Sequence, residues 1–267
     1  MAESKLYPGE QIIDDSTPDS HFDLTPDGMS KGYQGMFRSQ QSADELTVPF
    51  PAELLIPQSD WQGWIEETEA RKSRVSDLVT QAGLPCKDQA STNFCWANAP
   101  VHLLEVSRVI QNQTMVILSP ASVACPINNF RNQGGWGEDA LRQLITDGAV
   151  PVSKWPANAI QKQYYTEANI ALAKSYRAAE WWNLRPKNIN EHISCLLRRI
   201  PVAVGLNYWG HEVSDYEAVW VNGKIGVRFR NSWTMNWPTQ GAGGYSIRQG
   251  NKLPADDAVA IRTGTAS

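Results

Sequence analysis

The stretch that decides the fold is residues 89–97, which read Gln89-Ala90-Ser91-Thr92-Asn93-Phe94-Cys95-Trp96-Ala97. The residues from Cys95 to about 111 follow a helical pattern, so this cysteine is expected at the start of a helix. The unpaired N–H groups and the dipole at a helix start favour negative charge and are expected to lower the pKa of the thiol. Gln89 can point its side-chain amide at an oxyanion together with the Cys95 N–H. The stretch therefore predicts a nucleophilic cysteine and an oxyanion donor.

Two polar residues later in the chain complete the expected chemistry. His211 precedes one predicted strand, and Asn231 follows another in the run Arg230-Asn231-Ser232-Trp233. The oxygen of Asn231 can accept the imidazole N–H and fix the ring, while Trp233 can shield that bond from water. This arrangement follows the logic of a catalytic triad whose third member is neutral.

The quoted pieces resemble the papain family of cysteine peptidases. Residues 89–97 are similar to the family segment Gln-Gly-x-Cys-Gly-x-Cys-Trp-Ala, with the spacing from glutamine to cysteine kept. Further similarities follow in family order. Residues 118–125 resemble the family's Leu-Ser-x-Gln-x-Leu-x-x-Cys helix, and residues 134–135 fall where it has an Asn-Gly-Gly loop. Residues 201–204 resemble its Pro-Val-x-Val strand, and residues 231–233 and 243–245 resemble its Asn-Ser-Trp-Gly…Gly-Tyr ending.

The resemblance spans about residues 75–250 and implies a cysteine endopeptidase or amide hydrolase acting on a peptide or protein substrate. It implies Cys95 as nucleophile, His211 as base, Asn231 as the residue that orients the histidine, and Gln89 as oxyanion donor. It also implies substrate contacts for three further residues: Gly134, Gly135 and Trp233. The preference for particular substrate side chains stays open.

The chain departs from the family pattern at five positions. Thr92 replaces a family cysteine, and Asn132 stands where the disulfide partner of that cysteine would be. Thr234 replaces the glycine after Ser-Trp. Glu212 stands where the family has a small residue, and a carboxylate there could raise the pKa of the imidazole. Pro100 lies inside the predicted helix, where it removes a hydrogen bond and is expected to cause a kink.

The other cysteines and histidines are expected to be structural. The four cysteines are widely spaced and are expected as thiols: Cys86, Cys95, Cys125 and Cys195. Cys86 is either a loop thiol or a partner of Cys125, and Cys195 is expected in the core. His102 is expected to pack or lie at the surface, and His192 to be exposed. Without a Cys-x-x-Cys pair or a Cys/His cluster, we expect no metal and no cofactor.

The hydrophobic pattern predicts helices first and strands afterwards. Helices are predicted over residues 61–79, 95–111, from 120, 137–147, 166–182 and 189–199, and strands over 202–206, 218–221, 225–230, 244–247 and 258–261. Asn222-Gly223 predicts a hairpin turn. This segregation predicts an α+β fold with a helical N-terminal half, an antiparallel β-rich C-terminal half, and the active-site cleft between the two subdomains.

Residues 1–56 differ in composition from the rest of the chain. They hold ten acidic and three basic residues, although the net charge of the whole chain is only −4. Few apolar residues and no periodicity predict an extended arm that is ordered only against the body or a partner. The arm is a disordered tail, a propeptide-like segment that covers the active site, or an anchor in a larger assembly such as a phage particle. Residues 57–267 are predicted to form the catalytic domain.

Composition argues against several function classes. No basic run with interleaved aromatic residues points to nucleic acid. No apolar run approaches the ~18 residues that span a bilayer, and no secretory signal is visible, so we expect a cytoplasmic protein or one packaged in a virion. Two functions remain. The first is a peptidase. The second is a structural or interaction protein built on a papain-like fold, which contacts an assembly partner through its arm and either keeps or lacks peptidase activity.

Overall fold

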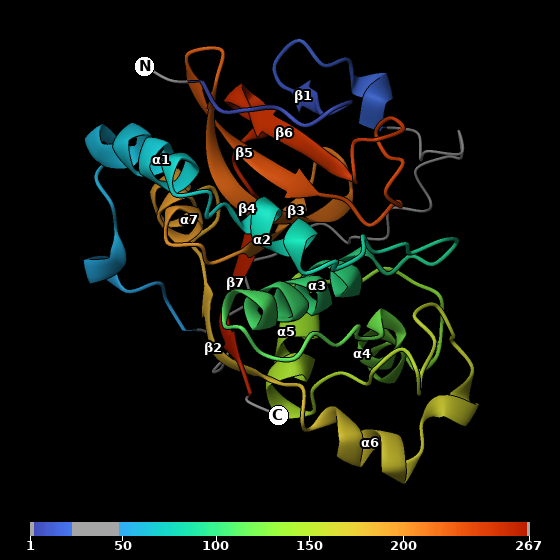
Figure 1. Ribbon diagram of the computed structural model, residues 1–267. Coiled ribbons are helices and arrows are strands. Elements are labelled where there is room, and N and C mark those ends of the chain that lie inside the picture. The colour runs from blue at the N-terminus through green and yellow to red at the C-terminus, as the bar shows by residue number, and fades with distance from the viewer. Residues whose placement is uncertain (1–2, 23–47, 266–267) are drawn as a thin grey trace.

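The computed structural model describes residues 3–22 and 48–265 (Figure 1). Its α-helices are α1 (Trp61–Ala70), α2 (Val75–Gln81), α3 (Cys95–Ile110), α4 (Pro120–Ile127), α5 (Gly137–Thr146), α6 (Glu167–Ala173) and α7 (Ile189–Leu197). Its strands are β1 (Gln11–Ile13), β2 (Ala178–Asn183), β3 (Val202–Leu206), β4 (His211–Val221), β5 (Lys224–Arg230), β6 (Tyr245–Gln249) and β7 (Asp257–Gly264). The predicted α+β class, with helices early and strands late, is confirmed.

One sheet of seven strands forms the β-rich part, in the order β1-β6-β5-β4-β3-β7-β2. All neighbours are antiparallel except β1 and β6, which run parallel. The predicted hairpin joins β4 to β5, and both turn residues, Asn222 and Gly223, have positive φ angles of 53° and 69°. That is the conformation that an Asn-Gly turn between twisted strands requires.

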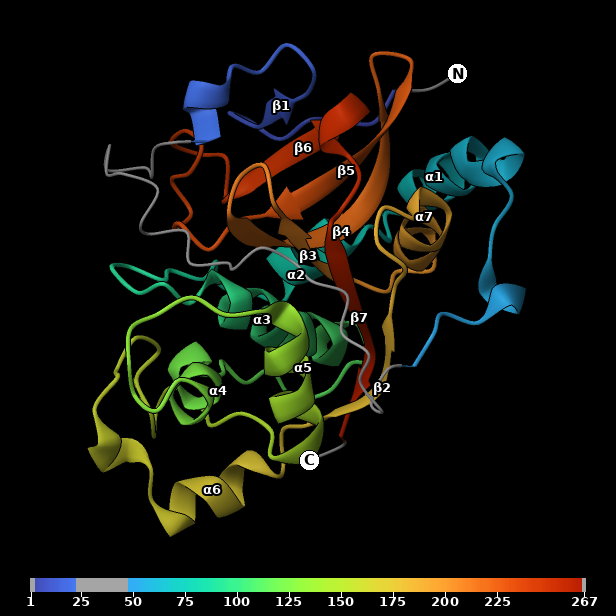
Figure 2. The ribbon, with the colours of Figure 1, turned by 180° about the vertical axis from the view of Figure 1, so that it is seen from behind.

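Two apolar clusters correspond to the two halves of the fold. One contains α7 and the strand residues of the β-rich half, such as Ile193, Val204 and Val227, and the other surrounds α3, with Leu103 and Leu144 in its interior. Seen from behind, α5 lies beside α3 and β7 (Figure 2). The helix α3 packs against both β4 and β7 and so joins the halves. In the part of the chain that the structure describes, no helix has the length and apolarity to cross a membrane.

The helix predicted over residues 166–182 is wrong in its second half. The helix α6 ends at Ala173, and residues Ala178–Asn183 form β2, which pairs with β7. Trp181 and Trp182 favour a strand, where a bulky aromatic ring packs against neighbours on the pleated surface. The helix predicted over residues 61–79 is divided into α1 and α2 by a turn in which Lys72 has a positive φ of 50°.

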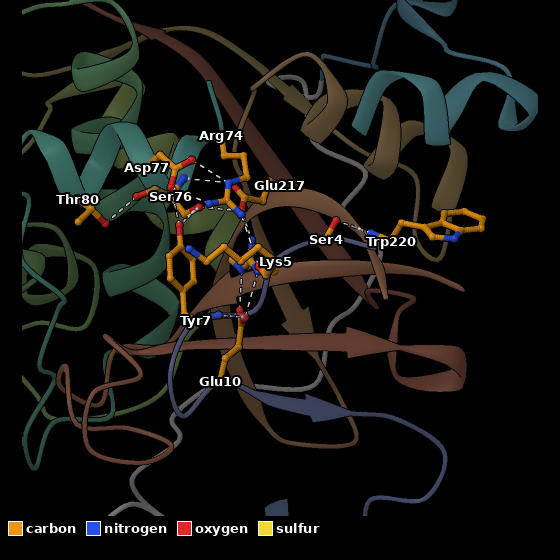
Figure 3. Close-up of polar contacts among 11 residues, drawn as sticks. Ser4, Lys5, Tyr7, Glu10, Arg74, Ser76, Asp77, Thr80, Glu217 and Trp220 are labelled. Carbon is orange, nitrogen blue, oxygen red and sulfur yellow. Dashed lines mark hydrogen bonds and ion pairs between the residues drawn. The ribbon is translucent and has the colours of Figure 1, made fainter. Parts of the chain in front are cut away.

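Residues 3–22 pack on the β-rich half through buried charges (Figure 3). The guanidinium of Arg228 on β5 lies between the carboxylates of Glu10, 2.6 Å from its Oε1, and Glu217 on β4. The Tyr7 hydroxyl lies 2.8 Å from Ser76 Oγ and 2.9 Å from Asp77 Oδ1 on α2. The strand β1 was not predicted, because three residues are too few to show an alternating pattern. The domain boundary after residue 56 stays a prediction, and residues 23–47 of the predicted arm lie outside the described residues.

We expect Glu10→Gln to lower the free energy of unfolding by about 3 kcal/mol, because it removes one carboxylate from a fully buried guanidinium. Chemical denaturation measures the loss. Glu53→Gln is the matched control, since Glu53 is exposed and its substitution should change stability by less than about 0.5 kcal/mol. Equal stability of the two variants would show that the buried pair contributes nothing to the fold.

Candidate active site

Cys95 is the first residue of α3 and is fully buried. The backbone N–H groups that lower the pKa of its thiol belong to Glu212, Trp96 and Cys95 itself. Glu212 is the second residue of β4 and the neighbour of His211. The predicted nucleophile therefore lies where the first turn of α3 meets the start of β4, which is where the predicted base begins its strand.

The expected low pKa of the Cys95 thiol is wrong for the folded chain. Burial raises the pKa of Cys95 well above its ordinary value, and the Glu212 carboxylate raises it further. The helix start and its N–H groups act in the predicted direction but are outweighed. The free-energy cost of removing a thiolate from water exceeds the stabilisation that a helix start, with a partial charge of about half an elementary charge, provides.

His211 and Asn231 form the contact that the sequence predicted. The ring Nε2 of His211 lies 2.7 Å from Oδ1 of Asn231, and both side chains are buried. The same Oδ1 accepts the backbone N–H of Ser232 at 2.7 Å. An oxygen that already accepts a backbone N–H is fixed in orientation, so the ring nitrogen facing it carries a proton. The contact therefore holds the imidazole in one tautomer.

Two tryptophans contact this histidine, and a third packs behind them. The Trp233 ring stacks on the His211 ring with centroids 4.5 Å apart, and the Trp209 ring lies 5.1 Å away. Trp237 packs on both indoles. These rings exclude water from the His211–Asn231 bond and strengthen it. The predicted shielding role of Trp233 fits this position, whereas its predicted substrate contact stays a prediction.

Gln89 is tied to the loop that carries Asn231. Its side-chain Oε1 accepts the hydroxyl of Ser232 at 2.6 Å, its Nε2 donates to the Thr92 carbonyl at 2.9 Å, and its backbone N–H donates to the Ser232 carbonyl. The residue is fully buried. The amide is thus held in one orientation by partners on both sides, as a preorganised oxyanion donor requires.

The two predicted glycines lie against the helix of the nucleophile. Gly134 and Gly135 are buried, and a Cβ on Gly135 would lie 2.5 Å from the Trp96 ring, so a side chain has no room there. Asn132 donates to the Ser91 carbonyl at 3.0 Å and accepts the Asn93 N–H at 2.7 Å. These hydrogen bonds join the two loops that a disulfide joins in the resembled family.

Thr234 stands where the family has glycine and keeps a positive φ of 72°. A β-branched residue is strained in this conformation. Its N–H donates to the Lys87 carbonyl at 3.2 Å, and its hydroxyl accepts the Asn236 N–H at 3.2 Å. The strained backbone is therefore held by hydrogen bonds on both sides, directly beside Trp233. Pro100 lies inside α3, and the helix continues through it.

Glu212 points to the opposite side of β4 from His211. Its carboxylate lies against Gly137, where a Cβ would be 2.1 Å from Oε1. Burial raises the pKa of Glu212 well above its ordinary value, and the carboxylates of Asp257 and Glu138 raise it further. Neither carboxylate oxygen forms a hydrogen bond with the described residues, although the Gly137 N–H is close enough to lower the pKa of Glu212.

Sequence reasoning missed two buried polar networks. His102 lies between Glu105, 2.9 Å from its Nδ1, and the Tyr216 hydroxyl, and Lys87 Nζ lies 2.5 Å from the same glutamate. Burial lowers the pKa of His102 to about 4. The spacing of His102 and Glu105 on one helix face was the available signal.

The expected exposure of His192 is wrong. It is buried, and its Nε2 lies 2.8 Å from Oδ2 of Asp215, which also pairs with Arg248. The partner on β4 lies 23 residues later in the chain, so no local pattern on α7 could show it.

All four cysteines are free thiols, and Cys195 is buried in the core as predicted. Cys86 does not reach Cys125, since its thiol donates to the Asn231 carbonyl at 3.0 Å. Burial raises the pKa of Cys86 to about 11 and that of Cys125 to about 12. In residues 3–22 and 48–265, no group of histidine, cysteine and acidic side chains could hold a metal ion.

Several solved structures with the same fold are cysteine proteases or their precursors. Xylellain, a cysteine protease from Xylella fastidiosa, is 16% identical with a TM-score of 0.61, over 87% of this chain and 97% of that one. Digestive procathepsin L 3 of the Tenebrio molitor larval midgut is 18% identical with a TM-score of 0.64, over 89% and 80%. Procathepsin B S9 from Trypanosoma congolense is 15% identical with a TM-score of 0.61, over 89% and 88%. No curated protein matches the sequence.

The family comparison agrees with the fold. The family model described as papain family cysteine protease matches residues 70–227. This range is more than half of the chain and includes Gln89, Cys95 and His211, while Asn231 lies four residues beyond it. The chain therefore belongs to the papain family of cysteine proteases and is a peptidase of that class.

Proposed function

We propose that this peptidase cleaves peptide bonds with Cys95 as nucleophile, His211 as base, Asn231 as the residue that orients the base, and Gln89 as oxyanion donor. The observation that carries the proposal is the 2.7 Å contact between His211 Nε2 and Asn231 Oδ1. His211 begins β4, and the next residue of that strand, Glu212, lies beside the Cys95 thiol. The substrate is a peptide or a protein, and no cofactor takes part in the proposed steps.

In the proposed reaction, Nδ1 of His211 takes the proton of the Cys95 thiol. The sulfur attacks the carbonyl carbon of the scissile bond, and the negative charge moves to the carbonyl oxygen. His211 then gives its proton to the departing amine, which leaves a thioester on Cys95. Water, deprotonated by His211, attacks the thioester, releases the acid and restores the thiol.

The negative oxygen needs donors that are already in place. Gln89 is held by Ser232 and Thr92, so its amide does not have to reorganise when charge appears. The N–H of Cys95 at the start of α3 is the second proposed donor. The Trp233 and Trp209 rings keep water from the imidazole, which makes each of these interactions stronger than it would be in solvent.

The other expectations concern where the protein acts. We propose that the acidic arm over residues 1–56 is either propeptide-like or an anchor to an assembly partner, and that the protein is cytoplasmic or packaged in a virion. A structural role in such an assembly is compatible with peptidase activity. These points stay predictions.

We expect iodoacetamide to alkylate Cys95 faster than the other three cysteines at neutral pH. His211→Ala should slow this reaction at least about a hundredfold, because the thiol loses its base. Mass spectrometry of the labelled peptide measures both rates. His102→Ala is unsuitable as a control because His102 belongs to a buried network, so the exposed Lys162→Ala serves instead. An unreactive Cys95 in both the full chain and an arm-deleted form would refute the proposed function.

We expect Gln89→Ala to lower kcat/KM about a hundredfold or more, the usual effect of losing one oxyanion donor. The rate of Cys95 alkylation by a small reagent should change much less, because alkylation develops no oxyanion. Cleavage of a fluorogenic peptide and thiol labelling are compared on the same samples. The exposed Gln163→Ala is the matched control. If cleavage and labelling fall together, Gln89 only supports the fold.

We expect Glu212→Gln to lower the pKa of the Cys95 thiol, because it removes a carboxylate that raises this pKa. The sign follows from charge: a thiolate is disfavoured beside a carboxylate, so removing the carboxylate favours it. The pH profile of Cys95 alkylation should therefore move to lower pH. Glu180→Gln on β2 is the control and should leave the profile in place. A shift to higher pH in Glu212→Gln would contradict the assigned electrostatic effect.

A further inference from the structure

A cavity of about 370 Å³ lies between α1, α7 and β7, and it shares no residue with the proposed active site. Both ribbon views place α1 beside α7 (Figures 1 and 2). The apolar lining of the cavity consists of Leu54, Trp64, Leu197 and Ile200. The polar lining consists of four arginines, Arg71, Arg198, Arg199 and Arg262, together with Glu67, Thr68 and Ser73. A volume of this size is in the range of small-molecule sites, which combine an apolar lining with a few charged groups.

Two of the four arginines already have a carboxylate partner. Arg71 pairs with Glu67 one turn earlier on α1, and Arg262 Nη1 lies 2.8 Å from Glu180 Oε1 on β2. These are exposed pairs, with both side chains of each at least 41% accessible. Exposed pairs of this kind are weak, so their guanidinium groups can turn toward a bound anion.

The other two arginines have no carboxylate partner among the described residues. Arg198 donates from Nε to the Leu54 carbonyl at 2.8 Å and lies over the Trp64 ring at 5.6 Å. These contacts hold the side chain in place but leave its charge uncompensated. Arg199 is exposed, and no described side chain forms a hydrogen bond or ion pair with it. The cavity thus has one preoriented and one free guanidinium.

The end of α7 does not cancel this charge. Arg198 and Arg199 directly follow α7, and a helix C-terminus carries a partial charge of about −0.5. Two full positive charges therefore exceed it by about 1.5 elementary charges. Basic residues after a helix often serve only to complement its dipole, but here they also face a cavity with two further arginines. Arg199 has a positive φ of 58°, a conformation in which non-glycine residues are uncommon.

We propose that this cavity binds a small phosphate monoester whose apolar part lies against Trp64 and Ile200 and whose phosphate lies between the arginines. A phosphate monoester carries a charge of about −1.5 to −2 at neutral pH, which matches the uncompensated charge of the cavity. Guanidinium groups bind phosphate oxygens through paired N–H donors. The apolar lining favours a ligand with an organic group over the bare inorganic ion.

Phenyl phosphate, inorganic phosphate and phenol are the probes, titrated calorimetrically into the full chain at low ionic strength. Phenyl phosphate should bind with a Kd on the order of 0.1 mM, which is reasonable for so small a ligand. Inorganic phosphate should bind at least about fivefold more weakly, because it cannot use the apolar lining. Phenol should not bind measurably, because it lacks the dianion. Phenyl phosphate should also raise Tm in a concentration-dependent way.

Arg199→Gln should weaken phenyl phosphate binding about tenfold, and Arg71→Gln should weaken it by a smaller factor, because Arg71 is partly compensated by Glu67. Both side chains are exposed, so both variants should fold and keep the Tm of the ligand-free protein. Arg131→Gln, an exposed arginine outside the cavity, is the matched control and should bind like the wild type. Raising the salt concentration should weaken binding to the wild type more than to Arg199→Gln.

Three results would overturn the proposal: no binding of phenyl phosphate below about 10 mM, binding of phenol as strong as that of phenyl phosphate, or equal binding by Arg199→Gln and Arg131→Gln. Inorganic phosphate binding as tightly as phenyl phosphate would overturn the apolar part of the assignment. These measurements need no turnover, so their outcome is independent of the proposed peptidase chemistry.

Discussion

The constraint on which the site depends is the register of β4 beside the first turn of α3. In the observed pairing with β3, Leu206 faces His211 and Gly205 faces Glu212. Side chains alternate along a strand, so a shift of one residue would exchange the two faces and present the carboxylate, instead of the imidazole, to Asn231. All of β3 and every residue of β4 except Trp220 are buried, so a shifted register would force both closely packed faces of the sheet to repack.

The contact between the start of β4 and the first turn of α3 also sets the protonation state of the Cys95 thiol. Cys95 lies at a helix start, which favours a thiolate, but it is fully buried beside the Glu212 carboxylate, which disfavours one. Burial has the larger effect, so the thiol is neutral unless a positive charge forms next to it. An imidazolium on His211 would supply that charge. In this arrangement proton transfer and activation of the sulfur are one event, because Cys95 and His211 are both fully buried and neither ion is stable there alone.

Local sequence patterns were sufficient where the physical cause is local. The start of α3 at Cys95, the start of α4 at Pro120 and the Asn222-Gly223 turn each depend on a few adjacent residues, and each was predicted correctly. Predictions failed where a distant partner decides the outcome. Residues Ala178–Asn183 become a strand because β7 offers an edge, and His192 is buried because Asp215 lies opposite.

The pairing of the site residues could be predicted from family order and spacing, but the shifts in their pKa values could not. Glu212 was expected to act on the imidazole, its neighbour in sequence; its clear effect is on the thiol. Two further carboxylates, Asp257 and Glu138, come from β7 and α5, far away in the chain, and together they raise the pKa of Glu212. A pKa depends on every charge within several ångströms and on burial, and both are properties of the folded chain.

The N-terminal residues also show that burial cannot be predicted from composition alone. Composition assigned residues 1–56 to an acidic extended arm, ordered only against the body or a partner, but it could not show which of the acidic residues are buried. In the fold Glu10 is a fully buried partner of Arg228, and Tyr7 bonds to α2. A buried guanidinium with one carboxylate fewer would cost several kcal/mol. Glu10 therefore stabilises β4 and β5, the strands that position His211 and Asn231, although it lies outside the site.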